Sequence, residues 1–432
     1  MGLSRVLPFS PSRRRVALRS GIAVAFVAVL ALTGCTPAAS GAAENPASDK
    51  IATTLDEVSQ EEFTDHEFTS LVAQVMVEGE VISTVTLGEE MTGFPITADS
   101  RFRNGAVAIM YMAATMLAMA DDGLIDIDEP ISRWLPNLPD ADNVTPRMLA
   151  SMTSGYPDHV ANGDFVIAQE ANPFRAWTEE ELLAYSSASP RLFAPGKNWD
   201  YSHAGYIILG HVLEAESGKT LEELISQYVL DPLKLNGTVA DVTAAVPDPV
   251  VHGFTAERGL FEDSTYWNPS WTLPHGAIET TTIGDMTSSF DAIVGRGELL
   301  TPKSHAAMIS TDLIGFGAPL DGCRSCHTLT KEWTYGLGVF LPAQRLGHAD
   351  AALRRVPGRG RNTPGGELPD GLRHGVGVGR SRPEYVHDRR VERRPAELRG
   401  HNRDRPRCAD RPHQSPAGSH TRPLNTHHLQ ER

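Results

Sequence analysis

Tyr201 and His203 lie two positions apart in the stretch DYSHAGY, and both side chains can exchange protons. A tyrosine hydroxyl donates and accepts hydrogen bonds, and histidine titrates near neutrality. Such a pair can act as general acid and base, or can hold a ligand by hydrogen bonds. The alternative for Tyr201 is simple packing beneath its own loop. A base needs a nucleophile or a water within reach, so the pair predicts a site without defining its reaction.

The cysteines offer a second chemistry. Cys323, Cys326 and His327 have the C-x-x-C-H spacing of haem attachment, and C-x-x-C also occurs in zinc sites. No cytochrome-like domain surrounds them, and the flanking segment APLDGCRSCHTLT is typical of a loop. We therefore predict a surface-loop disulfide between Cys323 and Cys326, no metal and no cofactor.

The beginning of the chain indicates export. A basic segment with three consecutive arginines precedes an apolar run at 21–32 that is too short to span a bilayer as a mature helix. It ends in Leu-Thr-Gly-Cys35, which resembles a bacterial lipobox; an ordinary cleaved signal is the alternative. We expect a signal peptide at 1–34 and a flexible tether at 35–58. A lipid on Cys35 would anchor the protein to the extracytoplasmic face of the cell membrane.

Charge divides the chain into three parts. Residues 1–35 carry +5 and residues 351–432 carry +9, which leaves −29 for residues 36–350 out of the total of −15. A strongly acidic central part stays soluble and repels nucleic acid, so we expect no nucleic-acid partner.

Periodicity places the main elements. Alternating apolar residues at 71–90, broken at Glu78-Gly79, predict a β-hairpin. Residues 105–120 form an apolar stretch with almost no polar face, which predicts a buried helix. We expect further helices at 146–152, 178–187 and 220–235, and one strand at 335–341. The segment 194–218 is expected to be a loop that runs into an amphipathic helix, which Gly218 stops.

The composition changes after residue 350. Residues 351–432 contain eighteen arginines and no lysine, with many Pro, Gly and His residues and no regular periodicity. Such a composition is typical of a GC-rich gene translated out of frame; a genuine disordered basic tail is the alternative.

Several segments, in order, resemble the serine β-lactamase and penicillin-binding-protein family with its D-Ala-D-Ala carboxypeptidase and esterase relatives. They are ADSRFRNGAVAIMYMAATMLAMADDGLIDIDEPISRWLPNLP, VTPRMLASMTSGYPD, APGKNWDYSHAGYIILGHVLEAESGKTLEELI, HGAIETTTIGDM, and YGLGVF before GH, and they span residues 60–350. The resemblance implies an α+β fold: an antiparallel sheet flanked by helices, plus an all-helical subdomain. We expect its C-terminal strands to be missing after residue 350.

The resemblance also implies acyl transfer through a serine ester, with Ser-x-x-Lys opening the buried helix. Here those positions hold Ala106 and Ile109, which carry neither a nucleophile nor a titratable group. None of the six lysines has a serine three residues before it. Tyr201 and His203 occupy the family's Tyr-x-Asn position, with His in place of Asn. His348 in Gly-His is a candidate for the substrate-binding strand.

Three hypotheses follow. The first is an exported, catalytically inactive lipoprotein that binds a cell-wall peptide or a protein partner. The second is a weakly active hydrolase of β-lactamase, carboxypeptidase or esterase type that uses other groups, such as His203 with water. The third is a decayed gene product without a function.

Overall fold

The computed structural model describes residues 46–91, 93–240, 243–341 and, for the backbone alone, 374–380. The strands are β1 Ser70–Val77, β2 Glu80–Gly88, β3 Phe102–Arg103, β4 Val239–Ala240, β5 Phe254–Thr255, β6 Glu262–Asp263, β7 Glu279–Thr281, β8 Thr334–Tyr335, β9 Phe340–Leu341 and β10 His374–Arg380. The α-helices are α1 Pro46–Asp65, α2 Val107–Asp121, α3 Pro146–Ala150, α4 Gly163–Ala171, α5 Glu179–Ser187, α6 His203–Ser217, α7 Leu221–Ile225, α8 Asp231–Leu233, α9 Ile283–Phe290 and α10 Pro302–Met308.

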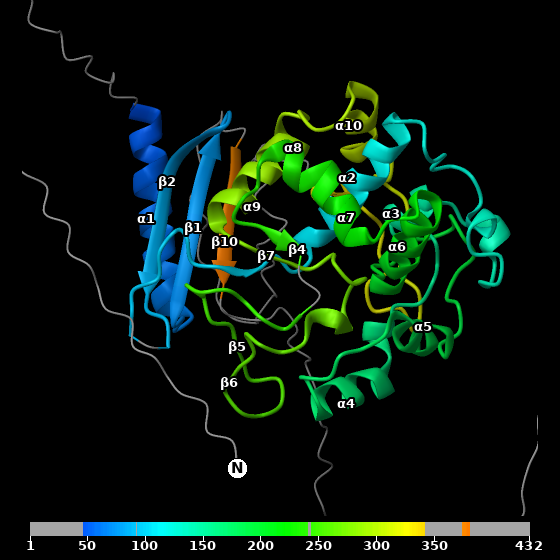
Figure 1. Cartoon of the computed structure of the whole chain (residues 1–432), viewed down its shortest axis with the longest axis horizontal. Helices are drawn as coiled ribbons and strands as arrows, with labels where there is room; N and C mark the ends of the chain where they lie inside the picture. Colours follow the sequence, from blue (N-terminus) through cyan, green and yellow to red (C-terminus); the bar gives the residue numbers. More distant parts are fainter. Residues whose placement is uncertain (1–45, 92, 241–242, 342–373, 381–432) are drawn as a thin grey trace, which may run out of the picture. The chain divides into compact units, whose positions relative to one another are not determined.

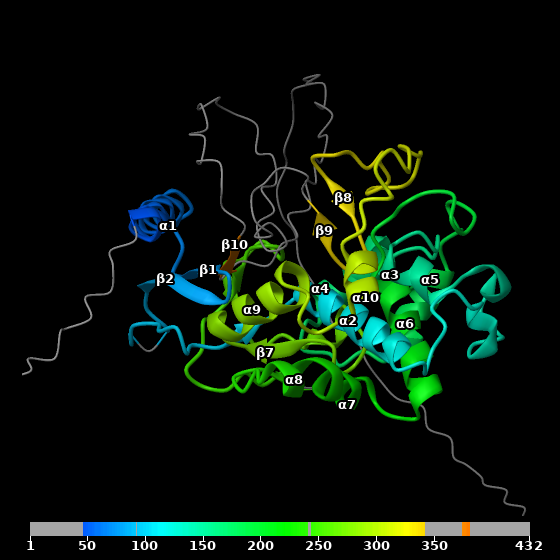
Figure 2. The same ribbon diagram turned by 90° about the horizontal axis from the view of Figure 1, so that it is seen from above.

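An antiparallel sheet in the order β10-β1-β2 lies between helices α1 and α9 (Figures 1 and 2). Side chains of a strand alternate between the two faces. Leu71, Ala73 and Val75 of β1 pack in one cluster with α1, whereas Val72 packs with Ile283 of α9. Because both faces of β1 are covered, its sequence is apolar almost throughout.

Helix α1 corrects the expected extent of the tether. Residues 46–58 were predicted as flexible, but they form the first three turns of this helix. Pro46 opens it, a position where the missing N–H costs nothing. Ile51, Leu55 and Phe63 then lie at helical spacing and pack on the β1–β2 hairpin.

The prediction that no strand follows residue 350 is wrong, because the structure has strand β10 at His374–Arg380. Its backbone pairs antiparallel with β1 over the whole length of β1 except Ser70, from Leu71 opposite Arg380 to Val77 opposite His374. Alternating Gly and Val in HGVGVGR give a strand-like period of two, and pairing satisfies the edge of β1. The rest of the predicted tail lies outside the described residues.

A second small sheet, in the order β3-β7-β4, leads directly into the buried helix α2. Every residue of α2 from Ala108 to Met119 is buried. The predicted buried helix is confirmed, and Gly123 ends it with a φ of 72°. Helices α2 to α8 then follow one another with no strand between β3 and β4, which confirms the helical part of the α+β fold.

Helix ends follow the capping signals of the sequence. Thr220 and Glu223 form a capping box before α7, and Thr178 with Glu181 forms another before α5. The chain leaves α6 through Gly218 at a φ of 69°. Capping therefore fixes where the helices that surround the buried α2 begin and end.

The segment 335–341 differs from the single strand expected. It is a hairpin, β8–β9, in which the Gly336 N–H donates to the Val339 carbonyl at 2.8 Å. Gly338 turns the chain at a φ of 76°. Glycine is the residue that adopts this conformation without steric cost.

Among the described residues, no helix has the length and hydropathy needed to cross a membrane. The apolar run at 21–32 and Cys35 lie outside the described residues, so the predicted export signal and lipid site stay predictions.

Candidate functional site

The first turn of α2 carries no group capable of catalysis. Ala106 is exposed and immediately precedes α2, and Ile109 lies one turn later with 2% of its surface exposed. A Cβ on Gly338 would lie 2.9 Å from the Ile109 carbonyl and 2.6 Å from Ala113 Cβ. The β8–β9 hairpin therefore packs its backbone directly on α2, and Ile109 is part of the core.

The lead-in to α2 is held independently of its first turn. Arg103 donates hydrogen bonds to the carbonyls of Ala244, Thr265 and Trp267 at 2.6 to 3.0 Å. These contacts tie three distant loop positions to the start of α2.

Asn104 makes a second, fully buried attachment. Its amide pairs with the Glu279 carboxyl, while the Glu279 N–H donates to Asn104 Oδ1 at 3.1 Å. Burial raises the pKa of Glu279 well above its ordinary value. Glu279 was not predicted as a site residue. The one indication in the sequence is that it is the single charged residue in the stretch AIETTT.

Tyr201 and His203 are brought together with the hairpin. Their rings lie 5.2 Å apart between centroids, and the half-buried Tyr201 stacks nearly parallel on Phe340 of β9 at 6.2 Å. The Tyr201 N–H donates to Ser325 Oγ at 3.1 Å. The segments of α2, α6 and β8–β9 that the sequence singled out thus meet in one region.

His203 is held by a carboxylate that sequence analysis did not single out. Its Nδ1 lies 3.0 Å from Asp158 Oδ2, and its backbone N–H donates to Asp158 Oδ1 at 3.2 Å. Burial alone would raise the pKa of Asp158, but the adjacent His203 and its hydrogen bonds lower it below the ordinary value. Since an ionised carboxylate only accepts, Nδ1 carries the proton and Nε2 of a neutral His203 presents a lone pair.

His159 lies beside Asp158 but does not carry a positive charge at neutral pH. It is fully buried, and burial lowers its pKa to about 4. It is neutral at physiological pH and its Nε2 donates to the Trp271 carbonyl at 2.9 Å. Its role is structural.

Cys323 and Cys326 form a disulfide in the structure, with their Cα atoms 5.5 Å apart. The loop lies against Asp200, which directly precedes Tyr201. The Asp200 carboxylate accepts a hydrogen bond from Ser325 Oγ. Burial, together with the nearby Asp158 charge, raises the pKa of Asp200 to about 6. His348, the predicted substrate-binding residue, lies outside the described residues.

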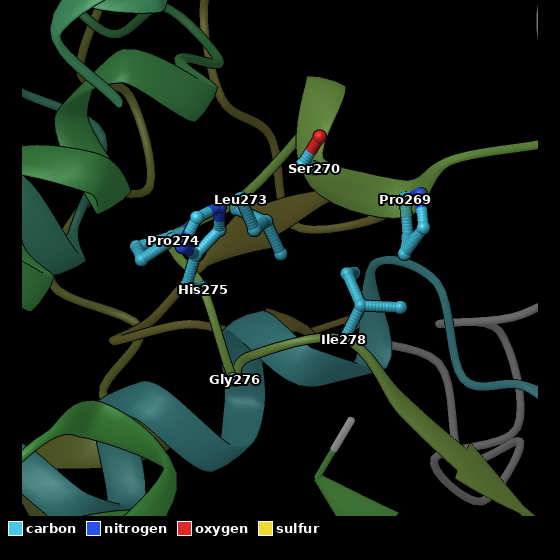
Figure 3. Close-up of a pocket in the computed structure, with 7 residues that line it drawn as sticks. All are labelled: Pro269, Ser270, Leu273, Pro274, His275, Gly276 and Ile278. Atoms are coloured by element: carbon cyan, nitrogen blue, oxygen red, sulfur yellow. The ribbon is translucent and has the colours of Figure 1, made fainter. Parts of the chain in front are cut away.

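Figure 3 shows a small hollow beside the segment that leads into β7, where His275 and Ile278 face Pro269 and Ser270. Its cavity volume of about 10 Å³ accommodates roughly one water molecule. It is too small for a substrate, so the hollow belongs to the packing of this segment.

Comparison with known proteins gives the family. The Beta-lactamase family model matches residues 49–380. The chain belongs to this family. The match continues to Arg380, the last residue of β10, and so includes part of the segment whose composition suggested a lost reading frame.

Curated relatives include hydrolases and penicillin-binding proteins. The chain is 27% identical to Penicillin-binding protein 4* of Bacillus subtilis (strain 168) over 37% of its own length and 34% of that protein. It is 29% identical to Esterase EstB of Burkholderia gladioli over 42% of its length and 50% of that protein. The chain thus spans about a third to a half of the length of these two relatives.

Solved structures agree on the fold. A D-stereospecific amidohydrolase from Streptomyces sp. matches with a TM-score of 0.53 and 25% identity, over 63% of this chain and 78% of that one. The D-amino acid amidase from Ochrobactrum anthropi SV3 matches with a TM-score of 0.55 and 24% identity, over 69% and 81% of the two chains. Together with the family model, these matches confirm the predicted β-lactamase-like fold.

The Asp158–His203 pair predicts a pH-dependent stability. A carboxyl whose pKa is lowered on folding stabilises the protein above its unfolded pKa, about 4, and loses that contribution as the pH falls through the folded pKa. Asp158→Asn should therefore lower the free energy of unfolding at pH 7 by about 1–3 kcal/mol and flatten its decline below about pH 4. Urea denaturation from pH 3 to pH 7 measures both effects. Asp142→Asn, at an exposed position, is the matched control; an equal effect of the two variants would contradict the assignment.

Proposed function

We propose that this chain binds a peptide ending in D-amino acids and does not hydrolyse it through a serine ester. The observation that carries the proposal is the first turn of α2, where Ala106 and the buried Ile109 occupy the Ser-x-x-Lys positions. Loss of the nucleophile of a serine hydrolase lowers kcat by about 10⁶-fold. Binding does not need that group.

The names of the relatives support this class of ligand. They include a D-aminopeptidase from Cereibacter sphaeroides and Penicillin-binding protein 4 from Amycolatopsis lactamdurans. Peptides of bacterial cell walls end in D-amino acids, so a cell-wall peptide is the ligand we propose for this chain. The half-buried Tyr201, which stacks on Phe340, supplies an aromatic surface for such a peptide.

One observation favours a second candidate function, hydrolysis by an activated water. Asp158 holds His203 Nδ1 in the manner that orients a general base, leaving Nε2 to accept a proton. Against it, only 4% of the His203 surface is exposed, which restricts the approach of a substrate.

One set of assays separates the two candidates. Calorimetry with an N-acylated D-Ala-D-Ala peptide should show binding that Tyr201→Ala weakens at least tenfold, because the stacked ring is removed. Release of nitrophenol from p-nitrophenyl acetate should not exceed that of buffer, since Ala106 and Ile109 leave the Ser-x-x-Lys positions without a nucleophile.

His203→Gln and His66→Gln complete the design, the latter changing an exposed histidine that directly follows α1. Turnover that disappears in His203→Gln but persists in His66→Gln would establish the second candidate in place of the first. Absence of both binding and turnover in the folded protein would reject both.

We further propose that the protein is exported and anchored to the membrane by a lipid on Cys35. The support is the sequence alone: the basic segment, the apolar run at 21–32 and Leu-Thr-Gly-Cys35. Cys35→Ser should move the protein from the membrane fraction to the soluble extracytoplasmic fraction. Cys408→Ser is the matched control and should leave it in the membrane; unchanged fractionation of Cys35→Ser would contradict the anchor.

A further inference from the structure

The disulfide loop and Asp200 bring three groups that bind metals around one point. The loop connects α10 to β8, and one potential ligand atom from each of Cys323, Cys326 and Asp200 lies within 4.8 Å of the others. Asp200 Oδ1 lies 3.3 Å from Cys323 Sγ. Asp200 is far away in sequence, so the tertiary fold, and not the C-x-x-C spacing alone, creates the cluster.

The oxidised loop has no capacity for a cation, because the sulfurs of a disulfide are neutral and bonded to each other. Reduction changes this. The Cys326 N–H points at Cys323 Sγ at 3.0 Å, a contact that stabilises a thiolate on Cys323. Two thiolates beside a carboxylate would repel one another unless a cation lies among them.

We propose that Cys323, Cys326 and Asp200 form a zinc site that exists only when the disulfide is reduced. Two thiolate sulfurs and one carboxylate oxygen are ligands that Zn²⁺ accepts, and a solvent molecule completes the tetrahedron. His327 is not the fourth ligand through Nδ1, because that nitrogen donates to the Ser325 carbonyl at 2.7 Å.

The chemical step uses a dithiol reductant. Its first thiolate attacks Cys323 Sγ, which is half-buried and more accessible than Cys326 with 8% exposure. The S–S bond breaks and a mixed disulfide forms; the second thiol of the reductant then releases Cys323 and becomes the oxidised cyclic disulfide. Two electrons and two protons pass to the cysteines, and Zn²⁺ binding displaces the two thiol protons to solvent.

The test uses the full chain carrying Cys35→Ser and Cys408→Ser, so that no other thiol is present. The protein is reduced with a phosphine, freed of it without oxygen, and titrated with Zn²⁺ against a chromophoric chelator. The reduced protein should bind one Zn²⁺, and Co²⁺ in its place should give a thiolate-to-cobalt absorption band. The oxidised protein should show neither.

Asp200→Asn tests the third ligand and should weaken Zn²⁺ binding at least tenfold. Asp321→Asn, an exposed change in the same loop, is the matched control and should bind like the parent. X-ray absorption of the zinc-loaded parent protein should show two sulfur neighbours at about 2.3 Å and oxygen neighbours at about 2.0 Å, a result that needs no further variant.

Three results would overturn the proposal: no 1:1 binding by the reduced protein, equal binding by the oxidised protein, or a zinc shell without two sulfurs. Equal affinity of Asp200→Asn and Asp321→Asn would remove Asp200 from the site and reject the three-ligand assignment.

Discussion

The attachment of the α2 lead-in is the constraint on which the rest of the site depends. Asn104 and Glu279 join the start of α2 to β7 by buried hydrogen bonds, and Arg103 joins it to three loop carbonyls. None of these contacts involves Ala106 or Ile109. The position of the helix is thus set before its first turn, and the chemistry of that turn can change without moving the helix.

The same separation explains how apolar residues can occupy the positions that correspond to the Ser-x-x-Lys motif. Ile109 is nearly fully buried in the main hydrophobic core, where a lysine would need either a paired charge or solvent. An isoleucine at this place adds apolar burial to the core. Ala106 and Ile109 are therefore compatible with a well-packed helix.

Much of this architecture could be predicted from local patterns. The β1–β2 hairpin, the buried α2 and the capping box at Thr220 follow from alternation, composition and capping chemistry, and the structure has each of them. Tyr201 and His203 could be located by the resemblance to the family's motifs, because the segments around them follow one another in the family's order along the chain.

The rest depended on tertiary contacts that no local pattern shows. Nothing in the sequence around Asp158 and Asp200 indicates their partners. The fold places Asp158 beside His203 and Asp200 beside Cys323 of the disulfide loop. The small, polar residues after Cys35 predict a tether, whereas the apolar side of helix α1 is apparent only from its packing on the sheet. β10 was missed because the arginine-rich composition around it concealed a short alternating segment.

We propose that the structural elements around the active site remain while positions 106 and 109 no longer carry a nucleophile and a base. We would therefore first record an intact-mass spectrum of the purified protein before and after incubation with a penicillin, because a serine ester formed with the drug would add its mass to the protein. We expect an unchanged mass. An added mass equal to one drug molecule would contradict it and reveal a nucleophile other than the residue at position 106.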